Sequence, residues 1–327
     1  LFLLDGSGSM LAPWEGKLRI QVAKKILSEL VDSLADVKNV ELALRVYGHQ
    51  YNKKYQNCTD TKLEVPFSTN NKQQLITKLE DVKPQGVTPL AYSLLQATKD
   101  FTKENNVRNV IIIITDGLES CDGNPCEISL QLQSKHIFLR PFVVGIDMPL
   151  KYENRFDCLG KFHNAKSSRQ LKTFLSTIVK KSMMQSWVRV NLLDIKGKAT
   201  ESNVNMSFIN HATGITEYDY VHQIKSDGTS DKVQIDPVPT YDLIIHTIPK
   251  VIKKNIEIEE EFTIIKVKTP QGSVKFTQGN MSEYKNLKTI VRKKGKSKTI
   301  HVLNENKTEK LLVGSYDIEI LSLPRIK

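Results

Sequence analysis

The sequence contains one short segment whose residue types suit metal binding. Asp5-Gly6-Ser7-Gly8-Ser9 follows the apolar run Leu1–Leu4, so it stands where a buried strand ends and a turn begins. One carboxylate and two hydroxyls alternate with glycines, which directs Asp5, Ser7 and Ser9 toward one centre and lets the backbone approach it closely. Carboxylate and hydroxyl oxygens are hard ligands, and hard ligands suit Mg²⁺, Mn²⁺ or Ca²⁺. The segment therefore predicts part of a divalent-cation site.

Two further polar residues stand where a parallel sheet would bring them to the same place. Thr88 lies in Gly86-Val87-Thr88-Pro89, a loop that opens a helix, and Asp116 lies in Thr115-Asp116-Gly117, directly after the apolar strand Val110–Ile114. Ligands of doubly wound sheets collect at the carboxyl ends of the strands. One metal site is therefore predicted from five residues: Asp5, Ser7, Ser9, Thr88 and Asp116.

Three other interpretations of the first segment have to be weighed. A nucleotide-binding loop also follows a strand, but Gly6-Ser7-Gly8-Ser9 lacks the third glycine of the dinucleotide motif and the lysine of a phosphate-binding loop. A phosphatase of the haloacid-dehalogenase type also begins with an aspartate after a first strand, yet it needs a second acid where this chain has Ser7. The third interpretation is a Gly/Ser turn without a metal, against which the contexts of Thr88 and Asp116 count.

The five residues resemble a known motif. Asp5-Gly6-Ser7-Gly8-Ser9, the later threonine and the aspartate after the apolar strand resemble the metal-ion-dependent adhesion site of the von Willebrand factor type A domain, over roughly residues 1–182. The resemblance implies that Ser7, Ser9 and Thr88 ligate the cation, with Mg²⁺ expected first, and that Asp5 and Asp116 hold its waters. It also implies one coordination position left for a carboxylate of a partner protein. Mostly neutral ligands leave the cation electrophilic, so an acidic side chain is attracted strongly.

Two residues near this motif are predicted to line the surface that a partner contacts. Trp14 follows the metal loop, and aromatic side chains are enriched where binding energy concentrates, although packing inside the protein is an equally good interpretation. Glu119 begins the loop Glu119–Cys126, which resembles a loop of bacterial secreted or envelope proteins with this domain, as does Tyr47-Gly48-His49. This loop either shapes the docking surface or stiffens the border of the site.

The elements that must position these residues alternate between strand and helix over residues 1–184. Strands are predicted at 1–4, 40–47, 62–67, 110–114 and 137–146. Helices are predicted at 20–34, 75–79, 90–101, 128–134 and 171–181. The fully apolar run 110–114 is typical of a central parallel strand, and Pro66 places 62–67 at a sheet edge. This order predicts an α/β domain with a doubly wound, mostly parallel, Rossmann-like sheet and helices on both faces.

After Trp187 helical spacing ends, and β-rich segments repeat at an offset of 75 residues. Thr240-Tyr241-Asp242 matches Ser315-Tyr316-Asp317 at this offset. The other matches are Gly197 with Gly272, Ile248–Val251 with Leu323–Ile326, and Asn205–Ser207 with Asn280–Ser282. The repeat predicts two small all-β sandwich domains, at 185–256 and 257–327. They resemble transthyretin-like or immunoglobulin-like modules, which implies a rigid stalk.

The four cysteines all fall in the first predicted domain, at positions Cys58, Cys121, Cys126 and Cys158. An even number of cysteines in polar loops suggests two disulfides and an oxidising compartment. Of the three possible pairings, we favour Cys121–Cys126 with Cys58–Cys158. A zinc site and four free thiols are the alternatives, although the chain has no CxxC pair to support zinc.

Composition and charge narrow the function classes. The 327 residues are 39% hydrophobic and 25% charged, which is typical of folded domains, and the net charge of +11 is spread over both halves of the chain. The dense basic run Arg292–Lys298 suits a solvated hairpin turn better than a phosphate patch, so no nucleic-acid partner is expected. No apolar run is long enough for a transmembrane helix. The chain has neither an HExxH nor a GxSxG motif, and we expect no enzyme.

The function expected from these features is metal-dependent protein–protein interaction or adhesion in the bacterial periplasm, on the cell surface or outside the cell. The alternative is a structural subunit of an envelope secretion or motility assembly, with a metal site that is non-functional or only stabilises the fold. Leu1–Leu4 begins as a buried strand without a lead-in segment, so we expect the protein, and any signal segment, to extend upstream of this sequence.

Overall fold

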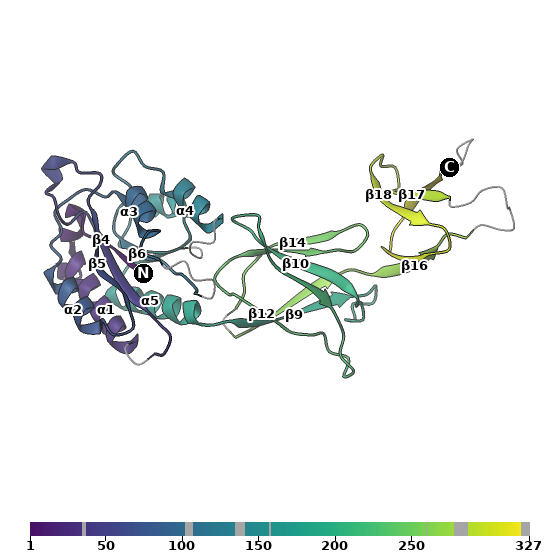
Figure 1. The fold of residues 1–327 in the computed structure, drawn as a ribbon, viewed down its shortest axis with the longest axis horizontal. Helices are drawn as coiled ribbons and strands as arrows, with labels where there is room; N and C mark the ends of the chain where they lie inside the picture. The colour runs from purple at the N-terminus through teal and green to yellow at the C-terminus, as the bar shows by residue number, and fades with distance from the viewer. Residues whose placement is uncertain are drawn as a thin grey trace. The chain divides into compact units, whose positions relative to one another are not determined.

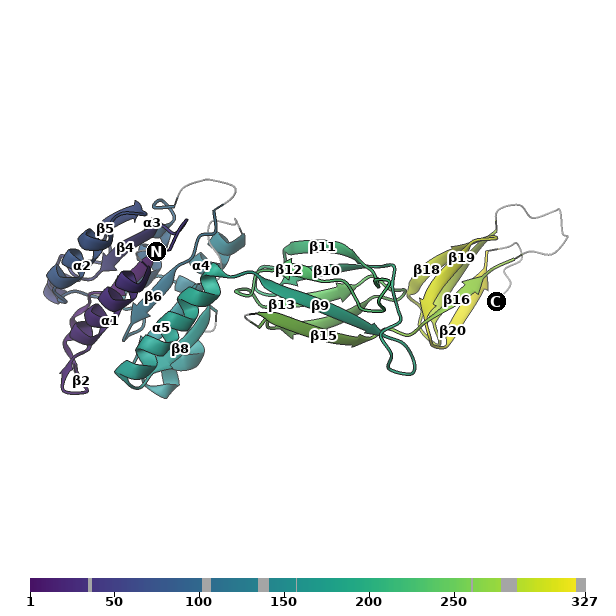
Figure 2. The same ribbon diagram turned by 90° about the horizontal axis from the view of Figure 1, so that it is seen from below.

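The chain forms two compact units, Leu1–Met184 and Gln185–Lys327. The computed structural model describes residues 1–34, 37–101, 107–134, 141–156, 158–259, 261–277 and 287–321. The first unit is an α/β domain built on a six-stranded sheet, and the second unit is all β (Figures 1 and 2). The predicted fold class, a mostly parallel α/β sheet followed by small β-sheets, is confirmed. No helix in the described part of the chain has the length and apolar character needed to cross a bilayer.

The sheet of the first unit has the strand order β5-β4-β1-β6-β7-β8. Its strands are β1 (Phe2–Asp5), β4 (Leu42–Tyr47), β5 (Thr61–Ser68), β6 (Ile112–Thr115), β7 (Phe142–Ile146) and β8 (Lys161–Ala165). Neighbours pair in parallel except β5, which is antiparallel to β4 at the sheet edge, where Pro66 costs no ladder hydrogen bond. Strand β8 was not predicted because it is an edge strand in which only Ala165 is buried. Residues 137–140 of the predicted fifth strand lie outside the described residues.

Helices cover both faces of this sheet, as the sequence predicts. They are α1 (Arg19–Leu34), α2 (Lys72–Asp81), α3 (Leu90–Ala97), α4 (Pro125–Ser134) and α5 (Ser168–Met183). Helices α1, α2 and α5 pack together over one face, and α3 packs with α4 over the other (Figure 1). The side chains that α1 buries recur at helical spacing, which is why this segment folds as an amphipathic helix.

The order of the strands creates a crevice beside β1. The chain leaves β1 for β4 and β5 on one side and returns to β6 on the other side. Such a switch point separates the loops at the carboxyl ends of the two strands that flank it. The switch point lies between β1, which ends at Asp5, and β6, which ends at Thr115. Leu3 and Ile113 are fully buried on these strands and fix both in the core.

A two-stranded hairpin and three 3₁₀ helices complete the first unit. The hairpin strands are β2 (Pro13–Trp14) and β3 (Lys17–Leu18), and the 3₁₀ helices are Gly8–Leu11, Lys53–Tyr55 and Leu150–Arg155. The first two 3₁₀ helices follow β1 and β4, so both belong to the loops at the carboxyl edge of the sheet. The predicted site therefore lies among short, locally ordered turns.

The second unit begins with a β-sandwich. One sheet has the order β11-β10-β13-β14 and the other β12-β9-β15 (Figure 2). The strands are β9 (Ser186–Leu193), β10 (Val204–Asn210), β11 (Thr216–His222), β12 (Val233–Ile235), β13 (Tyr241–Ile245), β14 (Val251–Ile256) and β15 (Phe262–Lys268). Side chains of both sheets, including Val190, Phe208 and Tyr241, form one hydrophobic core.

Five further strands follow in two smaller sheets, β16-β19 and β18-β17-β20. They are β16 (Gln271–Lys275), β17 (Lys288–Lys293), β18 (Thr299–Asn304), β19 (Thr308–Leu312) and β20 (Tyr316–Ile320). Tyr241 begins β13 and Tyr316 begins β20, so this part of the predicted repeat falls on strand starts. The matches at Asn280–Ser282 and Leu323–Ile326 lie outside the described residues. Residues 294–298 form the turn between β17 and β18, as predicted for the basic run.

The predicted boundary between the two β domains needs a correction. Division at 256/257 assigns Phe262–Lys268 to the second domain. Instead, β15 pairs in parallel with β9 along its whole length. Its alternate residues Thr263, Ile265 and Val267 are buried, and the last two pack in the core of the first sandwich. The opening strand of the second repeat therefore completes a sheet of the first.

Candidate metal centre

The predicted metal ligands come from three loops at the carboxyl edge of the sheet. Asp5 ends β1, and Ser7 and Ser9 follow in the turn that enters the 3₁₀ helix Gly8–Leu11. Asp116 directly follows β6, and Thr88 stands two residues before α3. All of these residues except Ser9 are buried. Buried carboxylates and hydroxyls at a switch point need polar partners, and the hydrogen bonds below show which partners they have.

Hydrogen bonds connect four of the five residues directly. The hydroxyl oxygens of Ser7 and Ser9 are 2.9 Å apart, and the Ser9 hydroxyl donates to Asp116 Oδ1 at 2.6 Å. Asp5 Oδ1 accepts the backbone N–H of Ser7 at 2.7 Å, and Asp5 Oδ2 accepts the hydroxyl of Thr115 at 2.7 Å. The loops after β1 and β6 therefore present their oxygen atoms to each other, as the sequence predicts for these residues.

The loop that carries Thr88 is bonded to the same turn. The backbone N–H of Gly8 donates to the Gly86 carbonyl at 2.9 Å, and the N–H of Gln85 donates to the Gly6 carbonyl at 3.0 Å. On its other side, the N–H of Thr88 donates to the Ser120 hydroxyl at 2.7 Å. Thr88 is 5% exposed, and within the described residues its hydroxyl has no hydrogen-bond partner. The loop that carries Thr88 is therefore hydrogen-bonded to the turn that holds Ser7, and direct ligation by the Thr88 hydroxyl stays a prediction.

Two glycines permit this close approach of loops. Gly48, after β4, has a φ of +68°, and a Cβ placed on it would lie 2.3 Å from the Val87 carbonyl oxygen. A Cβ on Gly86 would lie 2.8 Å from the Gly48 carbonyl oxygen. A side chain at either position would push the Thr88 loop away from the loop after β4.

We expect Gly48→Ala to destabilise the first unit by about 2–3 kcal/mol more than Gly16→Ala, because overpacking adds to the cost of a left-handed backbone. Gly16 is the matched control, since its φ is +76° and a Cβ there would meet no atom within 4 Å. Urea unfolding of both variants measures the difference. Equal losses of stability would show that overpacking between residue 48 and the Thr88 loop adds nothing to the loss in the free energy of unfolding.

The site contains an arginine that sequence reasoning missed. Arg19, the first residue of α1, places Nη1 2.8 Å from Asp116 Oδ2 and Nη2 3.4 Å from Asp147 Oδ2. Asp147 directly follows β7, so it stands at the same edge of the sheet. The signal in the sequence was weak: a cation at the start of a helix is common, and only the fold shows that this helix begins beside Asp116. Arg19 neutralises one of the two buried carboxylates.

The other carboxylate lacks a charged partner among the contacts described. Burial and, to a smaller extent, the charge of Asp116 raise the pKa of Asp5 to about 6, against the opposing effect of the hydrogen bonds from Thr115 and Ser7. A cation placed among these oxygens would favour the ionised form of Asp5. The electrostatics of the site therefore fit a positive ion.

The donor set also fits a hard divalent cation. Three hydroxyls and two carboxylates supply only oxygen atoms, which Mg²⁺, Mn²⁺ and Ca²⁺ prefer. The described residues contain no cluster of three or more His, Cys, Asp or Glu side chains suited to a metal. The zinc site considered for the cysteines is contradicted, because all four cysteines are in disulfides.

The disulfides differ from the pairing that we favoured. Cys58 is joined to Cys121, with Cα atoms 5.8 Å apart, and Cys126 is joined to Cys158, with Cα atoms 5.3 Å apart. Cys58 lies in the loop after β4 and Cys121 in the loop after β6, the two strands that flank β1, whereas Cys126 lies in the first turn of α4. Proximity in sequence suggested Cys121–Cys126, but the helix start separates these two residues. The first disulfide ties the loop after β4 to the loop after Asp116.

The two residues predicted to contact a partner make contacts inside the first unit. Trp14 is only 6% exposed, so its indole packs inside the first unit, which corrects the predicted surface role. The carboxylate of Glu119 accepts the N–H of Ala91 at 2.6 Å and the N–H of Cys121 at 2.8 Å. Burial raises the pKa of Glu119, while these backbone hydrogen bonds lower it. Glu119 therefore binds the first turn of α3; the residue is partly buried, and its contact with a partner stays a prediction.

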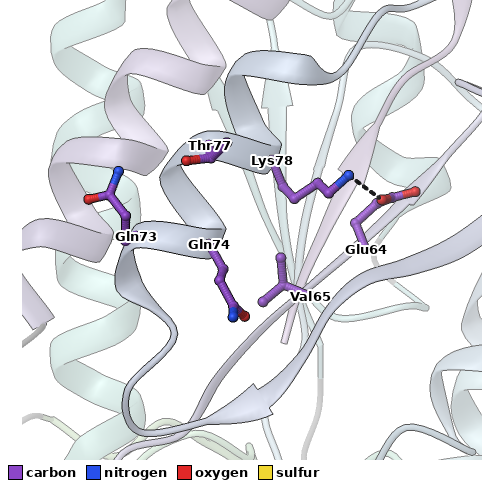
Figure 3. Close-up of a pocket in the computed structure, with 6 residues that line it drawn as sticks. All are labelled: Glu64, Val65, Gln73, Gln74, Thr77 and Lys78. Atoms are coloured by element: carbon purple, nitrogen blue, oxygen red, sulfur yellow. Dashed lines mark ion pairs between the residues drawn. The ribbon is translucent and has the colours of Figure 1, made fainter.

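A separate hollow of about 370 Å³ lies between β5 and α2 (Figure 3). Its lining residues are Glu64, Val65, Gln73, Gln74, Thr77 and Lys78. Lys78 Nζ lies 3.6 Å from one oxygen of the Glu64 carboxylate. The other oxygen lies within hydrogen-bond distance, 3.0 Å, of His49 Nε2. None of the predicted metal ligands lines this hollow, so it is distinct from the site at the sheet edge.

Comparison with known proteins places the first unit. Residues 1–180 match the model of the von Willebrand factor type A domain. Two uncharacterised proteins of Bacillus subtilis (strain 168), YwmC and YwmD, are each 30% identical to this chain, over 164 and 154 residues. These regions cover 49% and 46% of this chain and 70% and 68% of the two relatives.

Among solved structures, the pilus adhesin SpaC from Lactobacillus rhamnosus GG is similar at 12% identity with a TM-score of 0.47, over 98% of this chain and 53% of the adhesin. The family assignment rests on the family model and not on this structural similarity. The model matches more than half of this chain, including all five predicted ligand positions. The chain therefore belongs to the von Willebrand factor type A domain family.

Proposed function

We propose that this chain is a metal-dependent protein-interaction or adhesion module of a bacterial envelope or surface. In this proposal a divalent cation, Mg²⁺ or in its place Mn²⁺ or Ca²⁺, captures an acidic side chain of a partner protein. The observation that carries the proposal is the junction of three loops at one point: Ser9 bonds Asp116, Ser7 contacts Ser9, and the Thr88 loop bonds the turn between them.

The chain's own residues would prepare the site for such a partner. Ser7, Ser9 and Thr88 would hold the ion, and Asp5 and Asp116 would balance its charge. When bound, the cation supplies a positive charge with affinity for carboxylate oxygen. Asp5, Asp116 and Asp147 against the single guanidinium of Arg19 leave the site negative without the ion, and a divalent cation offsets that negative charge. Only the loaded site would attract an acid.

Two features support the location and the kind of activity in this proposal. Two disulfides support an oxidising compartment outside the cytoplasm. The oxygen donors lie in loops that are hydrogen-bonded to one another at the carboxyl edge of the sheet, which supports a binding role. The competing hypothesis, a structural subunit of an envelope assembly, uses the same ion only to stabilise the fold.

The test is retention of the chain on beads that carry a peptide with one aspartate, in Mg²⁺ and in EDTA. A peptide with asparagine at that position is the control. We expect retention only with aspartate and Mg²⁺. If EDTA lowers the melting temperature while retention is absent in both buffers, the ion stabilises the fold and the interaction function is wrong.

The stabilisation of the chain by Mg²⁺ should depend on pH. The pKa of Asp5 is about 6 in the folded chain, above the ordinary aspartate value of 3.8, so the metal-free fold takes up a proton between these values and loses stability as the pH rises through this interval. Mg²⁺ has to displace that proton, so its apparent affinity should fall by up to about tenfold per pH unit below pH 6.

Melting temperatures in Mg²⁺ and in EDTA, at about pH 5 and about pH 7.5, check this prediction. The difference between the two buffers should be small at the lower pH and large at the higher pH. K⁺ at equal ionic strength serves as the control for general salt effects. Equal Mg²⁺ effects at both pH values would contradict a role for the Asp5 carboxylate.

A further inference from the structure

The loop after β4 presents a run of exposed residues beside the candidate metal centre. Residues 50–56, here called the lysine–tyrosine loop, are exposed without interruption. Tyr51 is 48% exposed and Tyr55 is 64% exposed. Lys53 and Lys54 stand between them, and Lys54 Nζ lies 4.9 Å from the centre of the Tyr55 ring. Exposed aromatic side chains such as these tyrosines are enriched in contact surfaces for other proteins.

This loop is ordered although its side chains are exposed. The N–H groups of Gln50 and Tyr51 donate to the buried carboxylate of Asp60 at 3.0 and 3.1 Å. Asn52 Oδ1 accepts the N–H of Lys54 at 3.1 Å, which caps the 3₁₀ helix Lys53–Tyr55. The disulfide at Cys58 fixes the following residues. A partner that binds here would therefore find the tyrosines on a fixed backbone, and little conformational entropy would be lost.

The same loop is bonded to the segment that carries Thr88. The N–H of Lys53 donates to the Gln85 carbonyl at 2.7 Å, and Gln85 Nε2 donates to the His49 carbonyl at 2.8 Å. The next residue, Gly86, accepts the hydrogen bond from Gly8 in the metal-binding turn. The lysine–tyrosine loop and the metal-binding turn are thus both hydrogen-bonded to the backbone segment that leads to Thr88.

The charge of this loop has one sign. Residues 49–59 contain two lysines and no aspartate or glutamate. The next acid along the chain, Asp60, is 1% exposed and its carboxylate is occupied by backbone N–H groups of the loop. A partner that brings a single acid to the metal would leave the two lysines without a counter-charge. A partner with additional acids would pair with them.

We propose that the lysine–tyrosine loop is the part of the binding surface that selects the partner, and that the partner is a protein segment with several acidic residues and an aromatic or apolar side chain. One acid would reach the cation, further acids would lie near Lys53 and Lys54, and the apolar side chain would pack on Tyr55. This inference rests on the proposed function, because it assumes that the cation takes one acid.

Two short peptides of equal length test the inference. Both carry one aspartate and one phenylalanine; the flanking residues are glutamates in the acid-rich peptide and glutamines in the single-acid peptide. Binding is measured by fluorescence anisotropy in Mg²⁺ and in EDTA. The variants are Lys53→Glu/Lys54→Glu and Tyr55→Ala. The control, Lys38→Glu/Lys196→Glu, changes the net charge equally at two exposed lysines outside this loop.

We expect the unmodified chain and the control to bind the acid-rich peptide about tenfold more tightly than the single-acid peptide. Lys53→Glu/Lys54→Glu should remove this preference, and Tyr55→Ala should weaken both peptides by about tenfold. If the lysine variant keeps the preference, the inference is wrong even where binding needs Mg²⁺. If acid-rich binding survives EDTA and is lost in the lysine variant, the proposed function fails, and only the recognition of acids by the lysine–tyrosine loop remains of the inference. No binding of either peptide overturns both.

Discussion

Thr88→Ala should lower the affinity of the chain for Mg²⁺ by at least about a hundredfold, because it removes an oxygen that we propose binds the ion directly. Loss of a direct ligand weakens metal binding more than loss of a residue that only supports the ligands. The Thr88 hydroxyl is the one predicted ligand oxygen that has no hydrogen-bond partner in the described residues, so its loss leaves no other bond broken. The effect on affinity would therefore report on the ion alone.

Isothermal titration with Mg²⁺ measures this effect, and two variants complete the design. Thr88→Ser keeps the hydroxyl and should keep most of the affinity. Thr98→Ala removes an exposed threonine hydroxyl that bonds only the Leu95 carbonyl within α3, and it should bind Mg²⁺ like the unmodified chain. If Thr88→Ala binds Mg²⁺ with unchanged affinity, the ion does not lie where the three loops meet.

Removal of the Cys58–Cys121 disulfide should cost about 4 kcal/mol in the free energy of unfolding, because the bond closes a loop between residues 63 positions apart. The second disulfide joins residues 32 positions apart, and its removal should cost slightly less. Urea unfolding of Cys58→Ser/Cys121→Ser and Cys126→Ser/Cys158→Ser compares the two.

The two disulfides should differ more in their effect on the site than on stability. Cys121 donates its N–H to Glu119, whose carboxylate also binds Ala91 in the helix after the Thr88 loop. Loss of the first disulfide should therefore weaken Mg²⁺ binding, and the second variant provides the matched comparison at similar stability. If a reducing agent leaves the unfolding midpoint of the unmodified chain unchanged, the expected stability losses for both disulfides are wrong.

The five oxygen donors could be predicted because their signals are local. Each follows or precedes an apolar strand or a helix start, and the carboxyl ends of parallel strands meet by geometry. Asp5 and Asp116 needed only the assumption of a parallel sheet. The prediction for Thr88 needed the further assumption that the loop before α3 folds back toward the strand ends. The hydrogen bond from Gly8 to Gly86 agrees with that assumption.

The residues that sequence reasoning missed depend on contacts between distant elements. Arg19 belongs to the site only because α1 starts beside Asp116, and no spacing in the sequence expresses that. The disulfide pairing depends on which loops lie together at the sheet edge. For Trp14 the residue type left a role at the partner surface and packing inside the protein equally open, and its burial follows from contacts that the pattern does not contain.

The boundary of the β domains was missed for a related reason. A repeat of 75 residues marks equivalent positions, but equivalence does not say which sheet a strand joins. Residues Phe262–Lys268 alternate buried and exposed side chains, and this pattern suits the edge of either sandwich. Only the pairing with β9 decides it.

The pairing of β15 with β9 has a mechanical consequence. The first unit ends just before β9, and the second group of strands begins just after β15, so tension along the chain pulls the start of β9 and the end of β15 in opposite directions. Because these strands are parallel, such a force shears all their hydrogen bonds at once instead of opening them one after another. A module that holds its partner under flow or traction would resist extension at this point.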